Sequence, residues 1–418
     1  MMHHFKYRDN ELYCEEMAVQ KIAEAVGTPF YLYSHATLTR HFLAFNEAFR
    51  SANKLICYSA KANSNLAILK LFADLGCGLD IVSGGELYRG LNAGFAAKKI
   101  VYSGVGKQVH EIDYALKSDI LMFNVESLVE LQLINQRAGA LNKTAPVAIR
   151  VNPDVDPRTH PYISTGLKEN KFGIDATTAI EGYKIASQLE HVEVVGIGCH
   201  IGSQITEAKP FEDALLSLKA LIKKLKSLGI AIKYLDMGGG LGITYAQESP
   251  PPLHEYAASI IAHLKELDLQ LILEPGRVFV GNAGILVTKV LYRKSGEAKK
   301  FVVVDAGMND LLRPTLYNAF HAVEPVVNAD SSLMVADVVG PICESGDFLA
   351  IDRSISKVNA GDLLAVMSAG AYGYVMSSNY CSRPRVAEVM VKNDQFHIVK
   401  TRESYTDLIR GESVPPFS

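Results

Sequence analysis

Short apolar runs alternate with longer segments of helical period along most of this chain. From about residue 54, runs rich in β-branched residues recur, each bounded by small or polar residues. These runs are 54–59, 78–83, 99–104, 120–125, 147–152, 192–200, 234–239 and 271–276. Between them, segments such as 65–76, 127–139 and 211–229 repeat apolar residues at three- and four-residue spacing, which predicts amphipathic helices.

Two further features support this pattern. Residues 36–49 predict one more helix ahead of the first strand, and Gly229 ends the segment 211–229 as a helix stop. Eight strands alternating with about eight helices are typical of a (β/α)8 TIM barrel. An open, doubly wound sheet would show the same alternation, so the pattern favours the barrel without excluding the sheet.

The pattern of apolar and polar residues changes after about residue 285. Short strands spaced by turns follow, at 301–307, 333–340, 347–354, 362–370, 385–391 and 395–401. Residues 391–399 read as a hairpin, and the N-terminal residues 5–16 alternate in the same way around Asp9-Asn10. We therefore predict an α/β chain: a barrel over residues 36–285, and an all-β domain (sandwich-like or barrel-like) built from residues 1–35 and 286–418.

Composition narrows the class of protein. The 418 residues are 48% hydrophobic and 21% charged, which is ordinary globular usage and excludes a disordered chain. A net charge of -3 gives no basic footprint for nucleic acid. No run reaches the ~18 apolar residues of a membrane span, and the N-terminus lacks the apolar core of a signal peptide. We expect a soluble, cytoplasmic protein that binds neither nucleic acid nor membrane.

The six cysteines are scattered and form no C-x-x-C pair. This spacing fits neither a disulfide framework nor a zinc site, so most of them should be small buried thiols. Cys199 and His200 are adjacent, but a third ligand is not nearby in the sequence, and no metal is expected.

Candidate chemistry gathers where the predicted barrel strands end, which is where barrels carry their active sites. The polar residues and glycines at these ends are Lys61, Asp80, Ser83, Arg150, His200, Ser203, Gly238, Gly239, Gly240, Glu274 and Arg277. Taken singly, each has an ordinary interpretation, such as a solvated lysine, a core histidine or a turn with an ion pair. Together they supply an amine for a Schiff base, a carboxylate, and a glycine run that could free N–H groups for a phosphate before a helix. That set describes a pyridoxal 5'-phosphate (PLP) site.

Seven motifs carry a family resemblance. They are YSAKAN from Tyr58, GLDIVSGGE from Gly78, HIGSQ from His200, GGGLG from Gly238, EPGR from Glu274, CESGD from Cys343 and AYGY from Ala371. Their order and identity resemble the alanine-racemase-like, fold-type III PLP-dependent decarboxylases over roughly residues 28–385, and within them the branch that acts on diaminopimelate. No motif position departs from that pattern.

The resemblance implies a cofactor role for each matching barrel residue. Lys61 would carry the PLP, the His200 imidazole would pack on its ring, and Glu274 would partner the ring nitrogen. Asp80 and Arg150 would support the lysine. The expected anchors of phosphate and ring are Ser203, Gly238, Gly239, Gly240, Gly276 and Arg277, with Tyr372 touching cofactor and substrate.

The resemblance also implies a substrate and a dimer. Cys343 would be the proton donor, and the expected substrate contacts are Arg277, Arg313, Tyr317, Glu344 and Tyr372. Meso-2,6-diaminopimelate has a second carboxylate for the arginine forks and a second ammonium for Glu344. The implied reaction is its decarboxylation to L-lysine and CO2, the last step of lysine biosynthesis. The family pairs two chains head to tail, so Cys343 and Glu344 would enter the partner's barrel mouth in a homodimer.

Three alternatives remain at this point. A sibling decarboxylase would act on ornithine, arginine or carboxynorspermidine, although Glu344 beside Cys343 speaks against ornithine. A non-catalytic, antizyme-inhibitor-like or PLP-carrier protein should lack the lysine or the proton donor, and both are present. A barrel aldolase would use the Schiff-base lysine with no cofactor, and its purified form would be colourless.

Overall fold

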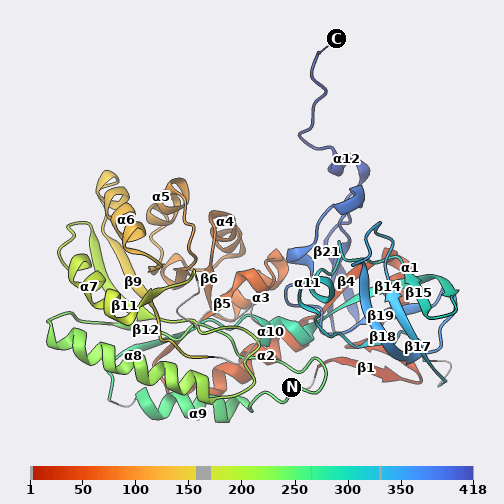
Figure 1. Ribbon diagram of the computed structural model, residues 1–418, viewed down its shortest axis with the longest axis horizontal. Coiled ribbons are helices and arrows are strands. Elements are labelled where there is room, and N and C mark those ends of the chain that lie inside the picture. The colour runs from red at the N-terminus through yellow and green to blue at the C-terminus, as the bar shows by residue number, and fades with distance from the viewer. Residues whose placement is uncertain (1–2, 157–170, 265, 329–331, 418) are drawn as a thin grey trace. The chain divides into compact units, whose positions relative to one another are not determined.

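The structure is a computed structural model that describes residues 3–156, 171–264, 266–328 and 332–417 (Figure 1). The chain divides into two compact units. One is continuous, Thr39–Phe279, and the other joins Met1–Leu38 to Val280–Ser418. No helix in these described ranges is long and apolar enough to cross a membrane.

The continuous unit is a closed barrel of parallel strands. Its strands are β5 (Lys54–Ser59), β6 (Gly78–Ile81), β7 (Ile100–Tyr102), β8 (Met122–Val125), β9 (Ala145–Asn152), β11 (Val192–Gly198), β12 (Tyr234–Asp236) and β13 (Gln270–Leu273). Neighbours pair in that order, and β13 returns to β5 with Leu271 opposite Lys54, which closes the ring. The two-residue strand β10 (Ile174–Asp175) adds to the end of β9. Closure confirms the barrel and excludes the open sheet.

Helices separate the strands and lie outside them (Figure 1). They are α2 (His35–Ala48), α3 (Leu66–Asp74), α4 (Gly84–Ala93), α5 (Val109–Lys117), α6 (Leu128–Ala140), α7 (Ala176–Ala186), α8 (Lys209–Ser227), α9 (Leu253–Leu264) and α10 (Arg277–Val280), with 3-10 turns η1 (Ala60–Ala62) and η2 (Ala97–Lys99). Local chemistry sets their ends. The hydroxyls of Ser83 and Ser127 cap α4 and α6, and Gly229, at φ +79°, follows α8 as predicted.

Five of the eight predicted strands end earlier than their apolar runs. The run 99–104 stops at Tyr102 and the run 192–200 at Gly198. The run 78–83 stops at Ile81 because Ser83 already caps a helix. The run 234–239 stops at Asp236, since Gly238 turns the backbone to φ +64°. The run 271–276 stops at Leu273, ahead of Pro275. The glycine and EPGR motifs therefore lie on loops past the strands, while Asp80 lies inside β6.

The barrel interior is apolar below the site. A core cluster draws one residue from each of six strands: Cys57, Val101, Met122, Ala148, Val195 and Ile272. These side chains point inward from alternating strand positions, as a filled barrel requires. The polar side chains of the predicted site lie toward the strand ends.

The second unit is mostly sheet. Its strands are β1 (Phe5–Arg8), β2 (Glu11–Cys14), β3 (Met17–Ala18), β4 (Phe30–Ser34), β14 (Gly284–Ser295), β15 (Lys300–Val304), β16 (Val323–Pro325), β17 (Leu333–Val339), β18 (Phe348–Ser356), β19 (Leu363–Val366), β20 (Ala387–Lys392) and β21 (Gln395–Lys400). Strands β1–β3 form a small antiparallel sheet, and the others form a second sheet with the path β18-β17-β15-β14-β4-β20-β21, in which β19 joins β14 to β16. Short helices interrupt them: α1 (Val19–Val26), α11 (Arg313–Tyr317) and α12 (Tyr405–Leu408), with turns η4 (Gly281–Ala283), η5 (Tyr374–Met376) and η6 (Tyr380–Ser382).

Both chain ends build this unit. The turn between β1 and β2 places Asp9 and Asn10 at φ +47° and +66°, as the predicted hairpin requires, and β20 pairs with β21 around Asn393. Strand β4 lies between β14 and β20. The hydrophobic pattern does not single out β4, because all five of its residues are buried and no polar alternation marks it.

Candidate active site

Lys61 lies in the turn η1, immediately past the first barrel strand. Its Nζ donates a 2.9 Å hydrogen bond to Oδ2 of Asp80, and Ser59 Oγ donates to the same oxygen at 2.8 Å. The Asp80 side chain is fully buried, whereas 33% of the Lys61 side chain is exposed. The amine is thus anchored on a buried carboxyl group and still open to an incoming molecule.

A second carboxyl group, on Glu274, lies beside this pair. The Glu274 carbonyl oxygen lies 3.0 Å from Ser59 Oγ and can share with Asp80 the single proton of that hydroxyl. Burial, followed by the charges of Asp236 and Asp80, raises the pKa of Glu274 well above its usual range, and Lys61 opposes that rise. Glu274 therefore takes up a proton more readily than an exposed carboxyl group does.

Asp236 completes the buried acidic group. Asn124 on β8 donates from Nδ2 to Asp236 Oδ2 at 2.8 Å, and the same nitrogen lies 3.4 Å from Oε1 of Glu274. Burial raises the pKa of Asp236 to about 6. Asp236 and Glu274 share a hydrogen bond. Two carboxyl groups this close hold a proton between them more readily than either would in water.

A buried lysine fixes the strand that carries Asn124. Lys107 Nζ donates to the carbonyl of Asn124 at 2.8 Å, to that of Gly104 at 2.7 Å, and to Oε1 of Glu130 at 2.6 Å. An ammonium has three donors, so this geometry uses each of them. The ion pair ties the loop after β7 and helix α6 to the end of β8, and so places the Asn124 amide.

His200 follows strand β11 and faces the glycine loop. The N–H of Gly239 donates to its Nδ1 at 3.2 Å, so the neutral ring carries its proton on Nε2. Burial lowers the pKa of His200 well below its usual value, and the positive charges of Arg150 and Lys61 lower it further. The imidazole is neutral and held in one orientation, which suits packing against a flat ring.

The glycine loop after β12 is shaped by close backbone contact. A Cβ on Gly239 would lie 2.1 Å from the Glu274 carbonyl oxygen, so this position admits only glycine. Gly240 has φ +114°, which also requires glycine. The prediction that the run opens a helix is wrong: α9 begins only at Leu253, because a left-handed turn and Pro250–Pro252 separate the two. The N–H of Gly238 donates to Asp236 at 2.9 Å, so part of this loop serves the protein's own side chains.

Arg277 joins three loops of the barrel. Its Nη1 donates to the Tyr245 hydroxyl at 2.7 Å, and its Nη2 donates to Ser203 Oγ at 3.0 Å. The side chain is buried. Both partners are neutral hydroxyls, so they orient the guanidinium without adding a negative charge beside it. Such a group suits a phosphate or a carboxylate.

Arg150 lies inside β9 and is held from both sides. Its Nη1 donates to Glu126 at 2.7 Å, and its Nη2 lies 3.4 Å from the His200 carbonyl oxygen. Glu126 also accepts the N–H groups of Gly104 and Gly173. Arg150 thus supports the backbone of His200, and its charge reaches the imidazole.

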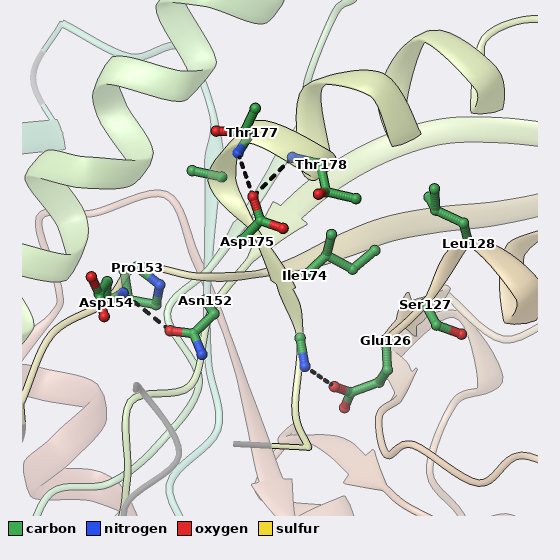
Figure 2. Close-up of a pocket in the computed structure, with 12 residues that line it drawn as sticks. Glu126, Ser127, Leu128, Asn152, Pro153, Asp154, Ile174, Asp175, Thr177 and Thr178 are labelled. Carbon is green, nitrogen blue, oxygen red and sulfur yellow. Dashed lines mark hydrogen bonds between the residues drawn. The ribbon is translucent and has the colours of Figure 1, made fainter. Parts of the chain in front are cut away.

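A hollow of about 840 Å³ opens near the ends of β8 and β9 (Figure 2). It is lined by Glu126, Ser127, Leu128, Asn152, Pro153, Asp154, Gly173, Ile174, Asp175, Ala176, Thr177 and Thr178. Asp175 points back to cap α7, and Glu126 accepts the Gly173 N–H at 2.8 Å. The hollow adjoins the support of Arg150 but contains none of the site residues predicted from the sequence.

The remaining predicted residues belong to the sheet unit. Arg313 and Tyr317 begin and end the one-turn helix α11, while Cys343 and Glu344 are exposed on the loop after β17. Thr315 Oγ1 donates to the Gly346 carbonyl at 2.6 Å and ties this helix to that loop. The structure therefore brings these four residues onto two connected segments.

Two tyrosines of the sheet unit are unusual, one in its backbone conformation and the other in its pKa. Tyr372 has φ +56°, a strained value for a non-glycine residue, in the loop after β19. The negative charge of Glu344 raises the pKa of Tyr380, and the two side chains share a hydrogen bond. Tyr380 was not singled out by any motif.

Sequence reasoning missed several groups that shape the barrel site. Ser59, Asn124 and Tyr245 contact the predicted residues directly. The signal for Asn124 was a polar residue inside a buried strand, and Ser59 was part of a quoted motif. Tyr245 follows the glycine run within a loop, where no pattern marks it.

Known proteins resemble this chain over nearly its whole length. A family profile described as "Pyridoxal-dependent decarboxylase, pyridoxal binding domain" matches residues 35–281. The chain is 51% identical to diaminopimelate decarboxylase of Haemophilus influenzae, over 99% of this chain and 100% of that protein. It is 50% identical to the Aquifex aeolicus protein of the same name, over 97% and 96%. A crystal structure of the Helicobacter pylori diaminopimelate decarboxylase complexed with L-lysine superposes with a TM-score of 0.91 at 44% identity, covering 94% of this chain and 98% of that one.

Proposed function

Because the chain belongs to the pyridoxal-dependent decarboxylases and, within them, to the diaminopimelate decarboxylases, we propose that its barrel site removes CO2 from meso-2,6-diaminopimelate and leaves L-lysine. The chain is a lyase of this family, and its cofactor is pyridoxal 5'-phosphate. The observation that carries the substrate is identity of about half the residues over nearly the full length of both chains. The sibling decarboxylases, the non-catalytic carrier and the aldolase have no comparable support.

The donor set of the barrel fits the cofactor. Lys61 offers an amine at a buried carboxyl group, and burial together with the charges of Asp236 and Asp80 raises the pKa of Glu274 although Lys61 opposes that rise. A protonated ring nitrogen would bring a further positive charge beside Glu274 and so offset the cost of burying its carboxylate. When bound, pyridoxal phosphate accepts the electron pair that stays behind as CO2 leaves the α-carbon.

Each barrel residue then has a physical task. Lys61 would hold the cofactor, and Asp80 accepts the hydrogen bond from its amine. Glu274 would partner the ring nitrogen, and Asp236 with Asn124 keeps the Glu274 carboxyl group in place. The neutral His200 would pack on the ring.

Anchoring the phosphate falls to the loops around Arg277. Ser203 and Arg277 already contact each other, so a phosphate would meet a hydroxyl and a guanidinium that are held together. Gly240 and Gly276 are the other proposed anchors, with Gly238 and Gly239 shaping the loop. The role of Gly238 and Gly239 in shaping the loop is supported by their N–H groups, which donate to Asp236 and His200.

Substrate recognition is proposed for the sheet unit. Arg313 takes the distal carboxylate, joined by Arg277, and Glu344 takes the distal ammonium. Tyr317 and Tyr372 complete the contacts. A substrate without the distal carboxylate would lose its charge-assisted hydrogen bonds to these guanidinium groups, which costs several kcal/mol in comparable cases.

The last step requires a proton at the α-carbon. We assign it to the Cys343 thiol, which is exposed on its own chain. Exposure suits a residue that works in another chain's site, so we propose a homodimer in which Cys343 and Glu344 complete the partner's barrel site. We place this enzyme in the cytoplasm, where lysine is made.

A side-by-side product assay tests the function. Meso-diaminopimelate, L-lysine, L-ornithine and L-arginine are each incubated with the PLP-loaded enzyme, and CO2 and amine products are measured. We expect CO2 and L-lysine from diaminopimelate, with little turnover of the other three. Faster turnover of ornithine or arginine would contradict the proposal.

A further inference from the structure

Arg313 is oriented by a buried histidine that no motif includes. Arg313 is only 6% exposed at the start of α11, and its Nη1 lies 2.8 Å from Nε2 of His321. His321 is itself 0% exposed. The short helix therefore presents its arginine against a ring that solvent does not reach.

The two nitrogens of His321 have opposite roles. Nδ1 lies 2.8 Å from the carbonyl oxygen of Met367, and a carbonyl can only accept. Nδ1 thus carries the proton, and the neutral ring has its lone pair at Nε2, facing the guanidinium donor. A protonated ring would oppose an N–H to an N–H, so this pair of contacts selects the neutral form and one tautomer.

The backbone of His321 is held as firmly as its ring. Arg353 Nη1 donates to the His321 carbonyl at 2.7 Å, and the Arg353 guanidinium lies 3.8 Å from the centre of the Phe320 ring. The N–H of Met367 also donates to the carbonyl of Ala322, next to His321 in the chain. Rotation of the imidazole away from Arg313 would break the contact with Met367.

We propose that His321 is a positioning residue for substrate recognition: it aims the guanidinium of Arg313 without neutralising its charge. A carboxylate in this place would hold Arg313 equally well, but it would compete with the distal carboxylate of the substrate. A neutral acceptor orients the fork and adds no negative charge that would compete with that anion. The proposal rests on the substrate role of Arg313 given above.

The test compares three substitutions at one position in the holoenzyme. His321→Gln keeps a neutral acceptor, His321→Leu removes it, and His321→Glu adds a charge. We expect KM for diaminopimelate to stay within about 3-fold in the Gln variant and to rise about 10- to 100-fold in the Leu and Glu variants, with kcat changed much less. PLP content should not change in any of them.

A diamine without carboxylates separates positioning from general damage. 1,5-Diaminopentane has both amines of the substrate and neither carboxylate, so its inhibition constant should change less than about 3-fold in every His321 variant. That of L-lysine, which keeps the distal carboxylate, should rise together with KM in the Leu and Glu variants. His41→Leu is the matched control, because His41 is also buried and contacts a carbonyl, that of Phe279, at 2.9 Å. Its KM for diaminopimelate should stay near wild type.

Arg313→Ala distinguishes failure of this proposal from failure of the assigned function. If Arg313→Ala raises KM but both His321→Leu and His321→Glu leave it unchanged, the positioning role is wrong and the assignment of Arg313 stands. If Arg313→Ala leaves KM unchanged, the assignment itself is wrong, and the role of His321 falls with it. If His321→Leu does not fold, the Gln and Glu variants decide, since equal KM values for these two would overturn the proposal.

Discussion

Three buried carboxyl groups lie near the amine of Lys61. Asp80 bonds to that amine, whereas Glu274 and Asp236 bond to each other and to Asn124. The first carboxyl group serves the covalent anchor, and the other two prepare a place for a positive ring nitrogen. The division follows from position. Asp80 lies inside β6 and Lys61 follows the neighbouring strand β5, whereas Asp236 ends β12 and Glu274 follows β13, the two strands before β5 in the ring.

The covalent anchor is the first residue-scale prediction. Borohydride reduction of the purified yellow enzyme should fix a pyridoxyl group on Lys61, found by peptide mapping. Lys61→Ala should lose this label and activity by a factor on the order of 100 or more, since the anchor and its amine are removed together. The surface variant Lys143→Ala should behave as wild type, and a label mapped to another lysine would refute the assignment.

The second concerns stability against pH in the cofactor-free protein. The pKa of Asp236 is raised to about 6 from an ordinary 3.8, so folding costs nothing at this residue below pH 3.8. As pH rises from about 4 to about 6, the unfolded chain loses its proton first, and this contribution to stability is lost. At about 1.4 kcal/mol per pKa unit, the loss approaches 3 kcal/mol.

Asp236→Asn should remove this dependence. Urea unfolding at pH 4.5 and pH 7 should show the variant gaining on wild type as pH rises, whereas the exposed substitution Asp268→Asn should show no such trend. A difference between Asp236→Asn and wild type that stays constant over this range would contradict the raised pKa.

At the scale of elements, the site depends on loops that touch one another. The glycine loop after β12 rests on the loop after β13, and Arg277 links that second loop to the one after β11. In the sheet unit, Thr315 ties α11 to the loop of Cys343. Strands fix where each loop begins, and these contacts fix where it goes.

Gly239→Ala tests the closeness of two loops. Its Cβ would meet the Glu274 carbonyl at 2.1 Å, so the loop must move away from the residue that faces the ring nitrogen. We expect a loss of about 1–3 kcal/mol in the free energy of unfolding and weaker PLP binding, measured by urea unfolding and cofactor titration. Gly106→Ala, where a Cβ meets nothing within 4 Å, is the control. Unchanged PLP affinity in Gly239→Ala would show that the loop contact does not position Glu274.

At the scale of the whole molecule, the proposed chemistry needs both units. Lys61 belongs to the barrel unit, and Cys343 to the sheet unit. If the dimer shares its sites, each site takes Lys61 from one chain and Cys343 from the other. Two-fold symmetry then makes the two sites equivalent.

Mixing two inactive variants tests shared sites. Lys61→Ala and Cys343→Ala homodimers should each be nearly inactive. A mixed dimer has one doubly damaged site and one intact site, and about half of the dimers are mixed after random exchange. About a quarter of wild-type activity should therefore return. No recovery after demonstrated subunit exchange would place both residues in one chain's site, and an active Cys343→Ala homodimer would show that the thiol is not needed.

The amino-acid sequence was enough to predict the barrel and the motif residues near its strand ends. Eight apolar runs separated by amphipathic segments leave few ways to bury both faces of a parallel sheet, and helix caps such as Ser83 and the stop at Gly229 are local signals. The same pattern predicted that the motif residues Lys61, Asp80 and Glu274 lie close together, because the strand ends of a barrel converge whatever the intervening sequence is. The pattern did not predict strand β4, because a strand that is buried on both faces shows no alternation of apolar and polar residues.

Only the tertiary structure decided which partners those residues have. Asn124 reaches Asp236 across 112 positions of chain, Tyr245 meets Arg277 from an unpatterned loop, and His321 meets Met367 across 46 positions. Such pairs are set by closure of the barrel and by the order of strands in the sheet, which bring distant positions together. Protonation also belongs to this level: the raised pKa of Glu274 arises from burial and from the charges of Asp236 and Asp80, and neither exists until the chain has folded.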